Sequence, residues 1–334
     1  MKINSTSKKI FIIVLMAFST FQCYCQILLP NGNAISSAQK ISPDSIITIK
    51  SLQETVAFLA SDNLKGRLTG SSGADIAANY IAREFRSSGL NMVSGFEGYF
   101  NSFKYQYEGK EVVVRNVLAV LPPLSFNDTT VIISAHYDHV GQGNDISYNK
   151  GYNRRDKIFN GANDNASGVA VMLSLAKYYA AARTNKYTLL FVAYSGEELG
   201  LIGSTKLSEE LENNIIKGVI NMDMMGRPLN NHCYIIGNNE SAVAKKLNAV
   251  LSANAGYPTA FFQKDEFPDE WLILRSDHYP FLNSTHFCFT LMASSPTDKY
   301  YHTVDDEYDT IDFNGMHKAA INIATALSIY LNVH

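Results

Sequence analysis

The sequence predicts an α/β fold with three layers, in which helices cover both faces of a doubly wound, mixed but mostly parallel sheet. The first observation behind this prediction is that short apolar runs typical of strands alternate with longer segments of helical periodicity. The second is size, because 334 residues with 46% hydrophobic content are enough to bury one large core. The third is that the sequence shows no internal repeat, coiled coil or low-complexity tract. We therefore expect residues 41–334 to form a single domain.

The first 25 residues have the pattern of a secretory signal peptide. Three lysines precede an apolar run at 10–18, and small residues stand at Cys23 and Cys25, where a signal peptidase prefers them. The run is too short to anchor the chain in a membrane. We therefore expect cleavage after Cys25 and export, to the periplasm or out of the cell, with residues 26–40 as a turn-rich leader.

Cysteine usage and charge narrow the class of protein further. A lipoprotein is a weaker interpretation of the N-terminus, because Gln22 or Tyr24 would precede the acylated cysteine, where a small residue is expected. Cleavage would leave Cys233 and Cys288, both in apolar runs, so two buried thiols and one disulfide both stay open, whereas a cysteine-built metal site does not. Loss of three of the 28 Lys and Arg residues would leave 25 against 31 acidic residues, which argues against nucleic acid or an anionic membrane as partner.

The first part of the domain carries two helix signals. Ser42-Pro43-Asp44 is a typical helix start, and residues 46–59 have helical spacing. A glycine-punctuated loop follows at 64–70. A second helix begins near Gly73 and ends at Gly89-Leu90, since glycine just after the last periodic residue is a common helix terminator.

Strands and helices alternate along the rest of the chain. The apolar runs at 112–121 and 131–135 are expected strands, separated by the turn Pro122-Pro123. By the same criteria the remaining expected strands are 188–194, 217–222, 233–236 and 286–291, and the remaining expected helices are 167–181, 204–213, 241–253 and 315–331. The polar segment from Gly141 to Asn160 is long enough to border a site.

Ligand-type side chains follow the expected strands at their carboxyl ends, where the binding site of such a sheet lies. One segment, Ser195-Gly-Glu-Glu-Leu-Gly, places two adjacent carboxylates there, and these repel each other unless a cation lies nearby. Five segments contribute in all: His136-Tyr-Asp138-His139, Gly161 to Gly168 with Asp164, Glu197-Glu198, Asp223, and Tyr301-His302.

Each of these residues alone has an ordinary structural explanation. A single histidine is most often structural, Asp164 alone would cap the helix that follows, and a bare Glu-Glu pair is usually a solvated turn. Together they indicate a metal site, because chance rarely places two histidines and three carboxylates at successive strand ends. Such ligands suit zinc and similar divalent ions. Five are too many for one open catalytic zinc and suit two ions that share a carboxylate.

These motifs, in this order, resemble the co-catalytic dizinc aminopeptidases related to bacterial leucyl aminopeptidase. The resemblance also rests on Asn221-Met-Asp223-Met, Ser276-Asp-His278 and Tyr301-His302-Thr303, and it covers nearly the whole chain from residue 64 onward. It implies a zinc-exopeptidase fold, two zinc ions per chain, and removal of N-terminal residues from peptides that have a free amino terminus.

The resemblance also implies a role for each matching residue. In the family's pattern, His136 and Asp223 would bind one zinc ion, Glu198 and His302 would bind the other, and Asp164 would bridge the two. Glu197 would be the general base, taking a proton from the metal-bridging water and passing it to the leaving amine.

Two acids are expected to orient the histidine ligands. Asp138 lies two residues after His136, on the same side of an extended chain, and would accept the other ring N–H of that histidine. Asp306, or Asp305, would do the same for His302.

Two alternatives and one departure stay open. A single-zinc glutaminyl cyclase has the same fold and a similar set of acids, but Asp164-Asn165-Ala-Ser-Gly resembles the dizinc hydrolases, and His136 with Asp223 completes a second site. A relative without catalysis would not need the full set of ligands. The oxyanion donor is unassigned, with Tyr301 as a weak candidate, because Trp271-Leu-Ile-Leu-Arg275 lacks the tyrosine that relatives often carry there.

Overall fold

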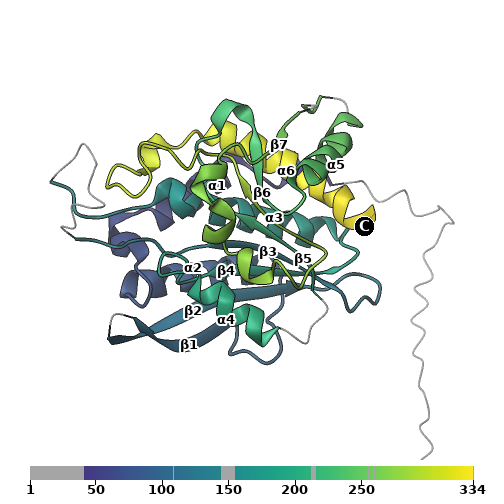
Figure 1. Ribbon diagram of the computed structural model, residues 1–334. Coiled ribbons are helices and arrows are strands. Elements are labelled where there is room, and N and C mark those ends of the chain that lie inside the picture. The colour runs from purple at the N-terminus through teal and green to yellow at the C-terminus, as the bar shows by residue number, and fades with distance from the viewer. Residues whose placement is uncertain are drawn as a thin grey trace, which may run out of the picture. The chain divides into compact units, whose positions relative to one another are not determined.

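Eight strands form one mixed sheet, in the order β1-β2-β4-β3-β5-β8-β6-β7 (Figure 1). The computed structural model describes residues 41–333, apart from 108, 144–154, 212–215, 255 and 259. The expected signal peptide and leader therefore lie outside the described residues. So do most of the polar segment at 141–160 and the last residues of the helix expected at 204–213.

The bounds of the elements match most of the expected ones. The strands are β1 (Phe100–Tyr107), β2 (Lys110–Leu121), β3 (Thr130–His136), β4 (Thr188–Tyr194), β5 (Ile216–Met222), β6 (Cys233–Gly237), β7 (Phe262–Lys264) and β8 (Phe287–Met292). The α-helices are α1 (Ile49–Leu59), α2 (Ser72–Ser87), α3 (Gly168–Ala182), α4 (Ile202–Glu210), α5 (Glu240–Ser252) and α6 (Phe313–Val333).

The centre of the sheet is parallel. Strand β3 pairs in parallel with β4 on one side and with β5 on the other, and β5 pairs in parallel with β8. The pairs β1–β2, β2–β4 and β6–β8 are antiparallel, while β6 and β7 are parallel. The predicted mixed, mostly parallel sheet is therefore confirmed.

Connections between the central strands place helices on both faces of the sheet. Helix α3 connects β3 to β4, and α4 connects β4 to β5, which lies on the other side of β3. Because crossovers between parallel strands are right-handed, connections that run in opposite directions along a sheet lie on opposite faces. The carboxyl ends of β3, β4 and β5 therefore border the crevice that forms where the strand order reverses.

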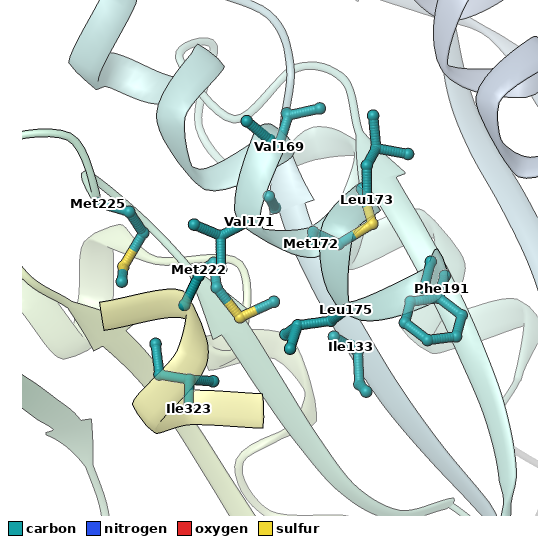
Figure 2. Close-up of a cluster of buried hydrophobic side chains, with 14 of the residues drawn as sticks. Ile133, Val169, Val171, Met172, Leu173, Leu175, Phe191, Met222, Met225 and Ile323 are labelled. Carbon is teal, nitrogen blue, oxygen red and sulfur yellow. The ribbon is translucent and has the colours of Figure 1, made fainter. Parts of the chain in front are cut away.

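Alternate residues of the central strands belong to two apolar layers, as strand geometry requires. On one face, Ile133 of β3 and Met222 of β5 pack in a core shared with α1, α2, α3, α5 and α6, and Figure 2 shows them near α3 together with Ile323 of α6. On the other face, Ile132 of β3 packs with Leu207 of α4. The site at the strand ends is thus built on a sheet that is buried on both sides.

Strands β1 and β7 are the elements that the sequence does not predict. Strand β1 lies at the sheet edge, and most of its residues are exposed or half-buried, so it lacks an apolar period. Strand β7 has three residues. Cys233 and Cys288 are buried free thiols, which decides between the two alternatives left open for them. Among the described residues, no helix has both the length and the apolar character needed to cross a membrane.

Candidate metal centre

Turns at one edge of the sheet present the ligand-type residues. The structure brings six sequence-predicted side chains to a cavity of about 270 Å³: His136 at the end of β3, Asp164 before α3, Glu197 and Glu198 after β4, Asp223 after β5, and His302 between β8 and α6. They form two groups that share one carboxylate.

The first group surrounds His136. Its Nε2 lies 3.3 Å from Oδ1 of Asp164 and 3.5 Å from Oδ1 of Asp223. Ligand atoms of His136, Glu197 and Asp223 all lie within 4.8 Å of one another. His136 is the last residue of β3, and Asp223 directly follows β5. The two residues meet because β3 and β5 are neighbouring parallel strands whose carboxyl ends lie at the same edge of the sheet.

The second group contains a residue to which the sequence analysis assigns no role. Nε2 of His302 lies 3.1 Å from Oδ2 of Asp164 and 3.1 Å from Oε2 of Glu198. His139 completes the group, since its Nδ1 lies 2.8 Å from Oε1 of Glu198. The sequence shows His139 three residues after His136, in the same motif, and this spacing could have indicated a role in the site. Beyond the end of a strand, however, spacing does not determine where a side chain points.

Asp164 belongs to both groups. Its Oδ1 faces His136 and its Oδ2 faces His302. Asp306 holds the backbone of this loop, because its carboxylate accepts hydrogen bonds from the N–H groups of Asn163 and Asp164, both at 3.0 Å. These contacts fix the backbone that presents Asp164, and the orientation of His302 by Asp306 or Asp305 stays a prediction.

Asp138 contacts His136 through its backbone and not, as expected, through its carboxylate. Nδ1 of His136 lies 3.2 Å from the carbonyl oxygen of Asp138 and 3.8 Å from its Oδ1. The carboxylate accepts hydrogen bonds from the hydroxyl of Thr69 at 2.8 Å and from the N–H of Glu197 at 3.3 Å. The expectation assumed an extended chain, but β3 ends at His136. Asp138 thus supports the turn that carries Glu197.

A buried arginine in the loop predicted at 64–70 connects these turns. The side chain of Arg67 donates hydrogen bonds to four backbone carbonyls, those of Leu59, Tyr137, Asn160 and Gly161. Burial lowers the pKa of Arg67 to about 10, although the carboxylates of the site oppose the shift, so the side chain is charged at neutral pH. Arg67 therefore supplies positive charge near the carboxylates and fixes the loops that present them.

The two adjacent glutamates have opposite pKa shifts. Burial raises the pKa of Glu197 well above its usual range, and the charge of Glu198 adds to this effect while His136 opposes it. Burial would also raise the pKa of Glu198, but His302 and His139 outweigh it and lower that pKa to about 2. Glu198 is therefore anionic at neutral pH, whereas Glu197 binds a proton much more readily.

The histidines show what charge the centre requires. Burial alone would lower the pKa of His302, but Glu198 and Asp164 raise it to about 11. The pKa of His136 is likewise raised well above its usual value by neighbouring carboxylates. In the protein alone, protons on the imidazoles balance the acids. Divalent cations would supply the same charge, and a donor set of imidazole nitrogen and carboxylate oxygen suits zinc, so the residues fit two such ions.

The mouth of the cavity is partly apolar and includes one cationic side chain, that of Arg275. Its lining includes Leu201, Met224, Leu272, Leu274, Met292 and Pro296. Nη2 of Arg275 donates a hydrogen bond to the hydroxyl oxygen of Tyr301 at 3.0 Å, and the ring of Tyr301 stacks on His302 with 3.9 Å between centroids. A polar pair therefore stands beside the second group, facing the same space.

Comparison with known proteins identifies the family. A model of peptidase family M28 matches residues 116–327, a span that includes every residue of both groups. The chain belongs to peptidase family M28. The predicted resemblance to the metallo-aminopeptidases is thereby confirmed at the level of the family.

Two curated relatives show how this M28 chain compares in length. A Phaeosphaeria nodorum protein described as "Probable zinc metalloprotease" is 28% identical over 211 residues, which cover 59% of this chain and 42% of that protein. Aminopeptidase YwaD of Bacillus subtilis is 23% identical over 224 residues, which cover 64% of this chain and 44% of that protein. The matched parts thus span less than half the length of these relatives.

Solved structures share the fold of this M28 chain. Porphyromonas gingivalis glutaminyl cyclase gives a TM-score of 0.67 at 17% identity, covering 85% of this chain and 99% of that one. A Zn-dependent exopeptidase from Parabacteroides distasonis gives 0.65 at 16% identity, covering 83% and 97%. At these identities the likeness shows the fold, and it confirms the predicted zinc-exopeptidase-like architecture.

Proposed function

We propose that this chain is a two-zinc aminopeptidase that hydrolyses N-terminal residues from peptides. The observation that carries the proposal is the position of Asp164, whose two carboxylate oxygens face two different histidines at 3.3 Å and 3.1 Å. A carboxylate shared in this way is what a pair of co-catalytic ions requires. Membership of a peptidase family and the aminopeptidase among the relatives support the same reaction class.

His136, Asp164 and Asp223 would hold one ion, and Asp164, Glu198 and His302 would hold the other. Bound zinc would supply Lewis acidity, which polarises a peptide carbonyl and lowers the pKa of water. The second ion would also have an open position for the free α-amino group of a peptide N-terminus, which favours an exopeptidase.

Glu197 is the proposed general base. It belongs to the first group, its backbone N–H donates a hydrogen bond to Asp138, and its raised pKa suits a group that takes and returns a proton. It accepts a proton from the attacking water and passes it to the leaving amine. Tyr301 is the proposed oxyanion donor, because it accepts a hydrogen bond from Arg275 and its own O–H proton stays available.

Metal content and substrate screening together test this function. We expect close to two zinc ions per chain after purification without chelator, and hydrolysis of aminoacyl arylamides. A stoichiometry near one that added zinc does not raise, together with cyclisation of a glutaminyl peptide, would contradict the proposal. It would favour the cyclase, whose fold this chain shares. Two bound ions without turnover of either substrate would indicate a relative that has lost catalysis.

We also propose that the protein is exported with cleavage after Cys25, so that its substrates are peptides outside the cytoplasm. The support is the lysine-rich start, the apolar run and the small residues before the cut. Intact mass of the exported protein should correspond to a chain that begins at Gln26. A lipidated cysteine or an uncut N-terminus would contradict this.

A further inference from the structure

We propose that His139 is a positioning residue of the second ion site. Its Nδ1–H donates a hydrogen bond to Oε1 of Glu198 and thereby directs Oε2 toward the metal. The inference rests on the proposed zinc-binding function. It adds a residue to which neither the sequence motif nor the comparisons assign a role.

The two oxygens of Glu198 have separate partners. Oε1 lies 2.8 Å from Nδ1 of His139, within hydrogen-bond distance, while Oε2 lies 3.1 Å from Nε2 of His302. The nearest oxygen of Asp164 to Nδ1 of His139 is 3.8 Å away, beyond a hydrogen bond. Ligand atoms of His139, Asp164, Glu198 and His302 all lie within 4.8 Å of one another, and within this group His139 has its hydrogen-bond contact with Oε1 of Glu198.

The ring of His139 is held in place by the backbone around it. The residue is fully buried, and its N–H donates a hydrogen bond to the carbonyl of Arg67 at 3.3 Å. A Cβ atom on Gly161 would lie 2.6 Å from Cγ and from Cδ2 of the ring, so the space for the imidazole depends on a glycine there. The same ring packs edge-on against His302 at 5.5 Å between centroids. An imidazole packed on these sides can orient a carboxylate that would otherwise rotate.

Positioning explains the geometry better than ligation. If Nδ1 bound the metal, the second ion would hold four side chains, which is the closed arrangement of structural zinc sites. With Nδ1–H donated to Glu198, three side chains, Asp164, Glu198 and His302, would hold the ion, and a position would stay open for substrate. A hydrogen bond from an imidazole N–H to a carboxylate is also strong, because the acceptor is charged.

Two substitutions and one spectrum test this role. His139→Phe fills the ring volume but has no donor, whereas His139→Asn keeps an N–H that can take the place of Nδ1–H. We expect His139→Phe to lower the affinity for one of the two zinc ions by about 10–100-fold in a chelator competition. The affinity for the other ion should be unchanged. His139→Asn should stay within a few-fold of the wild type. His317→Phe, a matched change on α6 outside both groups, should alter neither ion.

X-ray absorption of the zinc-loaded wild type needs no variant to fold and should show two imidazoles per two ions. Three imidazoles would make His139 a ligand and overturn the inference. So would unchanged affinity in His139→Phe, or an equal loss in His139→Asn. If the wild type binds one ion, the two-zinc function fails, yet a loss of that ion's affinity in His139→Phe would still support His139 as its positioning residue.

Discussion

Glu197 and Glu198 are adjacent in the same turn after β4, yet they have different surroundings. Two histidines contact Glu198, His139 at one oxygen and His302 at the other, and its pKa falls to about 2. Glu197 lies near one histidine, His136. Burial and the nearby negative charges together raise the pKa of Glu197 well above the usual range, against the effect of His136. One carboxyl is thus prepared to hold a cation, and its neighbour is prepared to exchange a proton.

The contrast extends to the two groups. In the second group the imidazole nitrogens face Glu198 and Asp164, so its acids are balanced by nearby nitrogen donors. Because Asp164 is already counted with the second group, the first group has His136 against Asp223 and Glu197, which leaves one acid in excess. We infer that the surplus acid in the first group is what makes a general base available. Three experiments challenge or refine this comparison, in order of decreasing expected effect.

Asp164→Asn should have the largest effect, because Asp164 is the residue shared by both groups. A neutral amide is a poor ligand for zinc and cannot serve two ions, so we expect both ions to bind more weakly. Activity should fall by at least the 10²–10⁴-fold that is typical for loss of a general base. Metal analysis after dialysis measures the first effect. Retention of two ions with ordinary affinity would show that the groups do not depend on the shared carboxylate.

Zinc binding should release protons at pH 8, because the raised pKa of His302, about 11, keeps its imidazole protonated in the metal-free protein. The apparent affinity should therefore rise with pH. In the metal-free protein, stability contributed by His302 is fully present below the unfolded pKa of 6.5 and is lost as pH rises through 11. Titration calorimetry in two buffers of different ionisation enthalpy counts the protons. A heat independent of buffer would contradict this charge balance.

Asp277→Asn should have the smallest effect. Asp277 is fully buried, burial raises its pKa to about 7, and its negative charge contributes to the raised pKa of Glu197. Removing that charge should lower the pKa of Glu197, so the acid limb of the kcat/KM profile should move to lower pH by roughly half a unit. A shift to higher pH would show that Asp277 acts on the base in another way.

The sequence predicts the central strands because apolar runs are local features of the chain. It predicts the site residues because binding sites of such sheets generally lie at the carboxyl ends of the strands. His136, Glu198 and Asp223 meet in the structure since β3, β4 and β5 are neighbours in the sheet. Strand β1 escapes prediction, because at the sheet edge it needs no apolar period.

Residues beyond the strand ends are less predictable, because loop conformation decides their contacts. Asp138 turns its carboxylate to Thr69, which lies 69 residues away in the chain. Arg67 reaches the carbonyl of Asn160 across 93 residues, and Asp306 reaches the N–H of Asn163 across 143. No local pattern encodes contacts of this range. His139 was visible in its motif, but its direction depends on Gly161 and on the turn after β3.

The division of labour between the two glutamates is tested most directly by converting each to its amide and measuring zinc content and kcat on the same preparations. Glu197→Gln should keep both ions and lose about 10²–10⁴-fold in kcat, because the amide has nearly the same shape but cannot accept the proton. Glu198→Gln should weaken the binding of one zinc ion, and excess zinc should partly restore activity. If Glu197→Gln lost zinc while Glu198→Gln retained both ions, the roles would be reversed, and full activity in both variants would contradict the mechanism.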